Sequence, residues 1–334
     1  MRALTILLKT LLYLSLTVAI LLGGWLTYFA HSPLVIDSYP KVFTVRQGST
    51  LRAVSRQLTQ QHIIQEPWSF WMLARLTGHG NNLKAGSYQL TESLSAYQLL
   101  NKLVKGDFHL SVVTIIEGWT FRQMREALDR NEHLKHDTQG LSDADILRKL
   151  NIPHQHPEGL FFPDTYFAAL GSSDLVVLKR AYDTMQTHLA EAWSERAADL
   201  PYRDAYEALI MASLVEKETG RASDRPMIAG VFANRLKKGM RLQTDPSVIY
   251  GLGSKFDGDL RKADLLTDTP YNSYTRSGLP PTPIALPGLH SLQAALNPAR
   301  TNALYFVARG DGGSHFSNSL DEHNRAVDKF IRGR

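Results

Sequence analysis

An uncharged apolar run near the N-terminus limits what this chain can fold into more than any other feature. Residues 10–30 read TLLYLSLTVAILLGGWLTYFA and contain no Asp, Glu, Lys or Arg. A helix of about 20 apolar residues crosses the hydrocarbon layer of a bilayer. The run is longer than the roughly 7–15 apolar residues of a signal peptide, so we expect a retained transmembrane helix, with a cleaved signal as the alternative.

The residues that flank this run predict its orientation. Arg2 and Lys9 precede it, and Trp25, Tyr28 and Phe29 lie at its far end, where aromatic residues commonly mark the membrane interface. The positive flank favours a cytoplasmic location for residues 1–9. Residues from about 31 onward are then expected on the outer side of the membrane.

The composition is that of a folded protein with an anionic partner. Of the 334 residues, 43% are hydrophobic and 21% are charged, which excludes large-scale disorder. The chain has no cysteine, and this excludes thiolate metal sites, cysteine nucleophiles and disulfides. The net charge of +5 suits nucleic acid, lipid headgroups or a carboxylate-rich polymer. The expected outward location disfavours nucleic acid.

Residues 31–106 predict a short tether and a small subdomain. Two prolines and the lack of periodicity indicate a tether over residues 31–41. The subdomain at 42–106 is expected to contain a strand, two helices, a second strand and a third helix that ends at Gly106. This order resembles a LysM-like module, a small fold that often binds glycan, and a purely structural subdomain is the alternative. The expected elements are a strand at 42–46, helices at 51–58 and 68–76, a strand at 84–90 and a helix at 95–105.

A second and larger domain is expected over residues 111–334, which makes the whole chain an α+β protein. It opens with a β-rich run at 112–120, followed by a helix at 121–129 and later by a long helix at 175–198. Between these helices lies the aromatic loop EGLFFPDTY. We expect Glu158 and Asp164 in this loop to serve turns or caps.

Two glutamates near the end of one predicted helix point in different directions. The segment RDAYEALIMASLVEKETG at 203–220 predicts a helix closed by Gly220. At about 100° per residue, Glu218 shares an apolar stripe with earlier residues of the helix, whereas Glu216 projects from the opposite side. The other members of the stripe are Ala208, Met211, Leu214 and Val215.

The position of Glu218 suits a general acid. A carboxyl group on an apolar face is partly desolvated, and this one also lies at the negative end of the helix dipole. Both effects raise its pKa. A raised pKa is what a carboxylic acid needs to donate a proton near neutral pH. A structural ion pair between Glu218 and a nearby cation is the alternative.

The segments that follow this helix have the composition of a sugar-binding surface. A further helix is expected to begin at a Ser223 or Asp224 cap, with Pro226 in its first turn, and to end at Gly239. The loops beyond it, MRLQTDPSVIYG and YNSYTRSGLPPTPI, are rich in Asn, Gln, Thr and Tyr. Sugar hydroxyls need many hydrogen bonds, and sugar faces pack on aromatic rings.

Several of these segments together resemble one family. The runs ASLVEKET, FANRL, MRLQTDPSVIYG, YNSYTRSGLPPTPIALPG and EHN occur in this order and are similar to motifs of the MltG, or YceG-like, endolytic murein transglycosylases. The likeness extends over most of residues 40–334 and includes the N-terminal span, the LysM-like module and the EGLFFPDTY loop. Glu218 matches the position of the catalytic glutamate of that family.

The resemblance implies a specific chemistry that needs no cofactor and no metal. Glu218 would protonate the glycosidic oxygen of the β-1,4 bond between MurNAc and GlcNAc in peptidoglycan. As a carboxylate it would then take the proton from the MurNAc C6 hydroxyl, which attacks C1 and leaves a 1,6-anhydro end. The resemblance also implies an inner-membrane protein with a periplasmic catalytic domain, which cooperates with peptidoglycan synthases and limits the length of nascent strands.

Other residues of the same motifs are candidates for binding the substrate or orienting Glu218, and holding a loop is the alternative for each. Asp245 could instead be a second carboxylate, so a lysozyme-type hydrolase stays open, because common glycosidases use two carboxyl groups about 5–9.5 Å apart. An anchored glycan-binding protein without catalysis is a third hypothesis. The candidates are Gln243, Thr244, Asp245, Tyr250, Asn272 and Tyr274.

Overall fold

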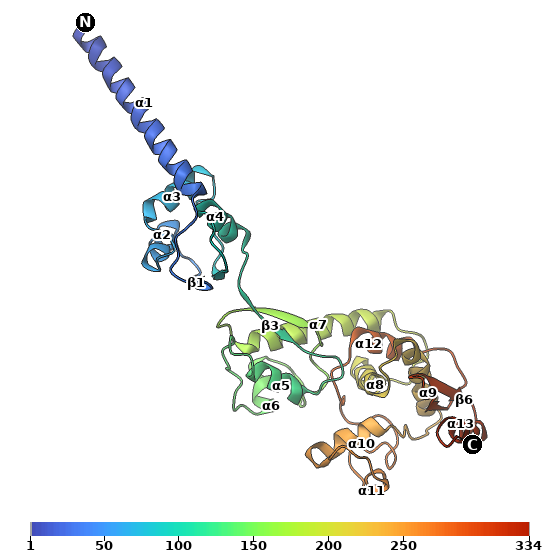
Figure 1. Cartoon of the computed structure of the whole chain (residues 1–334). Coiled ribbons are helices and arrows are strands. Elements are labelled where there is room, and N and C mark those ends of the chain that lie inside the picture. The colour runs from blue at the N-terminus through green and yellow to red at the C-terminus, as the bar shows by residue number, and fades with distance from the viewer. Residues whose placement is uncertain (1, 334) are drawn as a thin grey trace. The chain divides into compact units, whose positions relative to one another are not determined.

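The computed structural model describes residues 2–333, and the chain divides into two compact units with the boundary between Ser111 and Val112 (Figure 1). The larger domain was predicted to begin at residue 111. The two units carry separate hydrophobic cores. Helices and strands occur in both units, so the protein has a mixed fold of helices and short strands.

The first unit begins with a long apolar helix. Helix α1 covers Arg2–His31 and contains the predicted anchor. Within the described residues, its stretch Ile6–His31 is the one helix long and apolar enough to cross a membrane. The helix is exposed along most of its length, but Ala30 near its end is buried in the core of the unit.

The rest of the first unit is a strand, helix, helix, strand arrangement with an added helix, in the predicted order. Strands β1 and β2 pair antiparallel, with Phe43 opposite Tyr88, and their rings stack in the core. Helix α4 starts with a capping box between Ser95 and Gln98 and ends at Gly106, whose φ of 75° is left-handed as predicted for a helix end. The elements are β1 Lys41–Val45, α2 Leu51–Gln60, α3 Pro67–Leu76, β2 Gly86–Leu90 and α4 Ala96–Lys105.

The segment predicted as a tether packs against the unit instead. Pro33 forms an isolated bridge with Ser95, and the Leu34 N–H donates to the Leu94 carbonyl at 2.8 Å. Leu34 itself is buried in the core. Lack of periodicity is equally compatible with an extended segment that docks through its backbone, which is what residues 33–34 do.

The second unit is mainly helical, with two further two-stranded sheets, one pairing β3 with β4 and the other pairing β5 with β6. The β5–β6 pair is antiparallel, with Phe306 opposite Phe316. The strands are β3 Leu110–Thr114, β4 Thr165–Ala169, β5 Tyr305–Ala308 and β6 Ser314–Ser317. The helices are α5 Phe121–Asp129, α6 Asp143–Lys149, α7 Asp174–Ser194, α8 Ala205–Glu218, α9 Arg225–Lys237, α10 Asp245–Leu252, α11 Lys262–Leu266, α12 Leu289–Leu296 and α13 Leu320–Phe330, with short 3₁₀ turns at Ala222–Asp224 and Gly253–Lys255.

Helix α8 is the central helix of this unit. It packs against α12, α9, α7 and α10, and every residue from 208 to 215 is buried. The sequence predicted one buried apolar stripe on this helix, whereas residues 208–215 are buried on all sides of it. A helix that is apolar all round belongs in the core of a large domain.

The predicted closure of α8 by Gly220 is wrong, because the C-cap is Thr219. The helix ends at Glu218, and Thr219 follows in an extended conformation, with φ −147° and ψ 134°. Gly220 has no left-handed φ, so it does not close the helix. The Thr219 hydroxyl instead accepts the Arg221 N–H at 3.0 Å. This abrupt end leaves Glu218 as the last helical residue.

Helix α9 begins as predicted, with Asp224 as its N-cap residue and a proline in its first turn. Asp224 occupies the N-cap position without a side-chain cap hydrogen bond. Its carboxylate accepts the Ser314 N–H at 2.8 Å and thereby ties the start of α9 to strand β6.

Candidate active site

Glu218 lies partly buried at the C-terminal end of α8, beside the loop that leads into α10. The Thr244 hydroxyl donates a hydrogen bond to Glu218 Oε2 at 2.7 Å. Thr244 is buried and immediately precedes α10. No cation forms an ion pair with Glu218 among the residues that the structure describes. The geometry therefore favours the free acid over the alternative of a structural ion pair.

The surroundings of Glu218 raise its pKa. Desolvation by burial is the largest cause, and the nearby Asp245 carboxylate raises the pKa further. The Thr244 hydrogen bond and the positive charge of Arg235 act in the opposite direction. The C-terminal end of a helix also disfavours a negative charge. The net effect is upward, so more of the acid form is present near neutral pH than for an exposed glutamate.

A structural ion pair was the alternative for Glu218, but it is Glu216 that forms one. Its Oε1 lies 3.1 Å from the Arg225 guanidinium, and both side chains are nearly inaccessible. Its Oε2 accepts the Gly288 N–H at 3.0 Å. With both oxygens occupied, Glu216 links α8 to α9 and α12, and the prediction that it projects away from Glu218 agrees with these contacts.

Arg235 holds the loop that carries Thr244. Its guanidinium Nη1 donates to the Leu242 carbonyl at 2.8 Å and, less closely, to Gln243 Oε1 at 3.4 Å. Its Nε donates to the Leu304 carbonyl at 2.6 Å. The side chain is buried, and the guanidinium lies 5.1 Å from the centre of the Tyr305 ring. A single cation thus ties α9 to the loop before α10 and to the start of β5.

The predicted residues at the start of α10 and in the 271–274 loop meet each other. The Tyr274 hydroxyl donates to Asp245 Oδ1 at 2.6 Å, and the Gln243 N–H donates to the Ser273 carbonyl at 3.1 Å. Gln243 is exposed and has a positive φ of 49°. Gln243, Thr244, Asp245 and Tyr274 therefore form one connected cluster beside Glu218, and Thr244 is the member that hydrogen-bonds to it.

Asn272 is buried beside this cluster. It has 0% exposure, and its amide donates to three carbonyls, the shortest contact being 2.7 Å to Thr267. Its Oδ1 accepts the Tyr274 N–H at 2.8 Å. Substrate contact at Asn272 stays a prediction, and the geometry favours the alternative, in which it holds the loop.

Tyr250 points to a buried carboxyl group of the EGLFFPDTY loop. Its hydroxyl donates to Glu158 Oε2 at 3.0 Å, and its ring packs edge-on against Tyr271. Glu158 Oε1 accepts the N–H of Phe121, the first residue of α5, at 2.9 Å. The predicted capping role of Glu158 thus exists, although the capped helix is remote in sequence. Burial raises the pKa of Glu158 to about 7.

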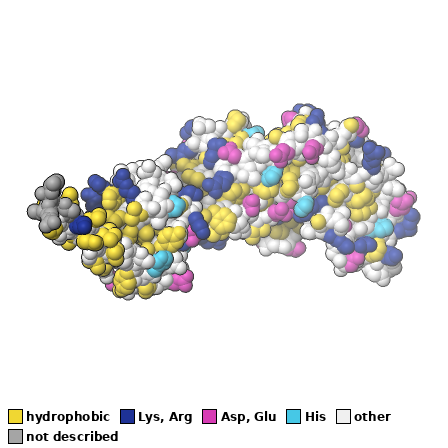
Figure 2. Space-filling model, turned by 90° about the horizontal axis from the view of Figure 1, so that it is seen from above, with side chains coloured by type: hydrophobic (Ala, Val, Ile, Leu, Met, Phe, Trp, Pro, Cys, Tyr) yellow, Lys and Arg dark blue, Asp and Glu magenta, His cyan; other side chains and the backbone are white. Residues whose placement is uncertain are grey.

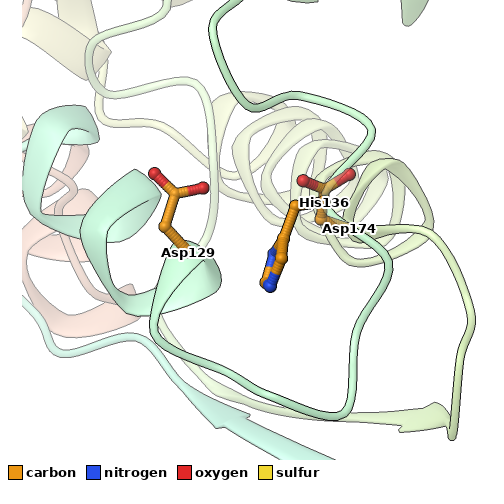
Figure 3. A group of neighbouring side chains, drawn as sticks. All are labelled: Asp129, His136 and Asp174. Carbon is orange, nitrogen blue, oxygen red and sulfur yellow. The ribbon is translucent and has the colours of Figure 1, made fainter.

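A separate group of possible metal ligands lies on other elements. Asp129 on α5, His136 in the following loop and Asp174 at the start of α7 each place one potential ligand atom within 4.8 Å of the others (Figure 3). Asp174 Oδ2 already accepts the N–H of Thr138 at 3.1 Å and its hydroxyl at 2.5 Å, while Asp129 is exposed. The buried aspartate therefore has a structural use without an ion, as a link between the loop and α7.

Sequence reasoning missed the role of Arg235 and the hydrogen bond between Tyr250 and Glu158. Arg235 and Glu158 lie in the motifs FANRL and EGLFFPDTY, but a motif does not say which groups are buried together. The available signal was a charged residue next to apolar ones, Arg235 before Leu236 and Glu158 before Leu160, Phe161 and Phe162, since a charged side chain that becomes buried must find partners.

Three comparisons with known proteins agree with these motifs. Residues 43–329 match the YceG-like family. The chain is 32% identical over 94% of its length to the endolytic murein transglycosylase of Bacillus subtilis strain 168, covering 92% of that protein. It is 28% identical over 93% of its length to the protein of the same name from Streptococcus pneumoniae serotype 2, of which it covers 63%.

The fold has a solved counterpart. A crystal structure of a YceG-like protein from Listeria monocytogenes superposes with a TM-score of 0.55 at 29% identity, covering 85% of this chain and 98% of that one. Together with the match over residues 43–329, this likeness establishes that the chain belongs to the YceG-like family.

Proposed function

We propose that this protein is a lytic transglycosylase of peptidoglycan, with Glu218 as its acid and base. The observation that carries the proposal is a partly buried carboxyl group at the end of α8, with a raised pKa and a hydroxyl donor at 2.7 Å. The relatives named endolytic murein transglycosylases support the same activity. The family likeness is also the basis for proposing internal cutting of strands.

The proposed reaction uses the two protonation states of Glu218 in turn. The acid gives its proton to the glycosidic oxygen while the bond from that oxygen to MurNAc C1 breaks. The resulting carboxylate takes the proton of the MurNAc C6 hydroxyl as its oxygen bonds to C1. Glu218 regains its proton, no water is consumed, and the strand ends in 1,6-anhydro-MurNAc.

The neighbours of Glu218 have separate roles in this proposal. Thr244 orients the carboxylate through its hydroxyl, and its hydrogen bond stabilises the charged form. Asp245 and Tyr274, which are joined at 2.6 Å, present a polar edge to the sugar. Gln243 is exposed beside them and adds an amide that can bind sugar hydroxyls.

A lysozyme-type hydrolase is the second candidate, and Asp245 is the observation that favours it. Its charge raises the pKa of Glu218, so the two carboxyl groups are neighbours. A second carboxylate could activate a water molecule or stabilise a positively charged sugar intermediate. The mass of the products distinguishes hydrolysis from lytic transglycosylation, because a hydrolase leaves a reducing MurNAc end that is one water heavier than the anhydro end.

The decisive experiment is digestion of purified peptidoglycan by the wild-type protein and by Glu218→Gln. Loss of the proton donor should lower the rate by about 10²–10⁴-fold. Glu195→Gln is the matched control, because Glu195 is exposed at the end of α7. Release of anhydro-MurNAc ends by Glu218→Gln at the wild-type rate would refute the role of Glu218.

We further propose that α1 is a single-pass anchor in the inner membrane, with the residues from about 31 onward in the periplasm. The support is the apolar stretch Ile6–His31 and the positive residues Arg2 and Lys9 on its N-terminal side. Protease added to spheroplasts should digest the folded units and spare the N-terminal end. Protection of the whole chain would contradict the orientation.

The small subdomain is proposed to be a LysM-like glycan-binding module, with a purely structural role as the alternative. Its strand, helix, helix, strand order supports the likeness. A groove of about 710 Å³ runs between the loop before α2 and the loop after α3 and is lined by polar groups such as Ser49, Asn81 and Asn82 together with Trp71. Replacement of Asn81 and Asn82 by alanine should weaken binding to insoluble peptidoglycan. Unchanged binding would favour the structural role.

Peptidoglycan synthases are the proposed protein partners, because cutting of nascent strands would have to occur where they are made. This part of the proposal is supported by the family likeness alone. Strand-length analysis after deletion of the gene tests it, with longer strands as the expected result. Unchanged strand lengths would contradict it.

A further inference from the structure

The last turns of α1 pack into the folded part of the first unit, residues 31–111, which we call the module, and are not a free stalk. Leu26 and Phe29 pack against the core of the first unit. The Trp25 indole N–H lies 3.5 Å from the Ser69 hydroxyl at the start of α3. At a rise of 1.5 Å per residue, Trp25 is roughly 9 Å below His31, where the helix ends. The start of α3 therefore contacts α1 about one and a half turns before the helix ends.

The depth of Trp25 in a bilayer follows from the length of the helix. With Lys9 at the inner boundary and about 20 residues across the hydrocarbon layer, the outer boundary falls near Phe29. With the helix shifted outward until Ile6 reaches the inner boundary, the outer boundary falls near Leu26. In both settings Trp25 and the contacting start of α3 lie within roughly 6 Å of the boundary.

The start of α3 carries the side chains expected at such a depth. Trp68 is 43% exposed although it adjoins a packed core, and Tyr28 on α1 is 68% exposed. Gln65, also exposed, lines a cleft of about 160 Å³ together with Trp25 and Tyr28. Tryptophan and tyrosine are the residues that favour the membrane–water interface. Figure 2 is seen from the side where α1 begins, and hydrophobic side chains gather over α1 and the adjoining module there.

Arginines without acidic partners surround these aromatic residues. Arg52 and Arg56 on α2 line one groove with Trp68 and Trp71. The Trp71 ring is approached by the guanidinium groups of Arg52 at 5.3 Å and Arg75 at 5.5 Å. Among the residues that the structure describes, none of the three arginines forms an ion pair. The nearby Glu66 accepts the Ser69 hydroxyl at 3.3 Å.

We propose that the α2–α3 side of the module is a second membrane-contact surface that binds anionic phospholipid. Trp68 enters the interface beside α1, and Arg52 and Arg56 bind lipid phosphate groups. The surface rests on the proposed role of α1 as a membrane anchor. It fixes the first unit against the bilayer, so the module would not swing freely at the end of a tether.

Because the sequence has no cysteine, a single introduced cysteine can be labelled specifically, and its depth in the bilayer can be measured. The full chain is placed in nanodiscs with a single NBD-labelled cysteine, and quenching by lipids with nitroxide-labelled acyl chains is measured. Gln65→Cys reports on the proposed surface, and Leu16→Cys reports on the span. Asp107→Cys is the matched control, because Asp107 is exposed just beyond the far end of α4.

The proposal predicts several-fold stronger quenching at residue 65 than at residue 107, and a clear loss of quenching when Trp68→Ala is added to Gln65→Cys. Phosphatidylglycerol in the nanodisc should increase the quenching at residue 65, and the double variant Arg52→Gln/Arg56→Gln should abolish this increase. Equal quenching at residues 65 and 107, with strong quenching at residue 16, would overturn the surface and leave the anchor intact. Weak quenching at residue 16 would overturn the anchor and the surface together, and an increase unaffected by the arginine changes would overturn the phosphate contacts.

Discussion

Replacing Glu158 by glutamine isolates the energetic cost of one buried carboxyl group. Glu158 is 6% exposed, and its two oxygens accept hydrogen bonds from the Phe121 N–H and the Tyr250 hydroxyl. Glutamine has nearly the same shape. Its carbonyl can accept from Phe121, and its NH₂ can donate to the Tyr250 oxygen. The variant thus resembles the protonated form of Glu158 at every pH.

The sign of the effect follows from proton linkage. Burial raises the pKa of Glu158 from 4.5 to about 7 in the folded protein. Below the ordinary value the group is protonated in both the folded and the unfolded state. Between the two values the folded state binds more protons, so the free energy of unfolding falls as the pH rises. Above about 7 the loss is complete.

The size of the effect follows from the same two numbers. The interval from 4.5 to about 7, at 1.36 kcal/mol per pH unit, corresponds to about 3 kcal/mol. Glu158→Gln does not titrate and does not incur this cost. The wild-type and variant proteins should therefore be about equally stable near pH 4, and the variant should be about 3 kcal/mol more stable near pH 8.

Urea unfolding of both proteins, followed by tryptophan fluorescence, measures this difference. Comparing the two proteins at each pH cancels the titration of all other groups. A stability difference that is the same near pH 4 and near pH 8 would refute the reasoning, because the carboxyl group would then not titrate in this interval. A variant less stable than the wild type near pH 8 would also refute it.

Three further changes test the site. Thr244→Val removes a hydrogen bond that favours the Glu218 carboxylate, so the pKa of Glu218 should rise and the basic limb of the pH–rate profile should move to higher pH, whereas Thr244→Ser should leave the limb in place. Arg225→Met leaves the nearly inaccessible Glu216 unpaired and should destabilise the fold by about 3–5 kcal/mol in urea unfolding, and a loss within error of zero would show that the pair is solvated. Asn272→Ala frees three carbonyls and should lower the melting temperature and the reaction rate together, and a rate loss at unchanged stability would instead indicate substrate contact.

Local signals in the sequence were sufficient for much of the secondary structure. Helix α5 has the predicted bounds, and Gly106 ends α4 in the predicted left-handed conformation. Both depend on capping and glycine geometry, which are properties of neighbouring residues. Gly220 failed as a helix end because Thr219 already leaves the helix in an extended conformation and its hydroxyl accepts the Arg221 N–H, which leads the chain toward the 3₁₀ turn at Ala222–Asp224.

The sequence by itself determined the apolar segment of α1, the order of the elements in the first unit and the different directions of Glu216 and Glu218 on α8. Helical periodicity separates those two glutamates, and length and charge define the span. Only the tertiary structure decided that Glu216 pairs with Arg225 and that Thr244 donates to Glu218. These partners are brought together by the packing of helices that are separate in sequence, and periodicity within one helix carries no information about which surfaces meet.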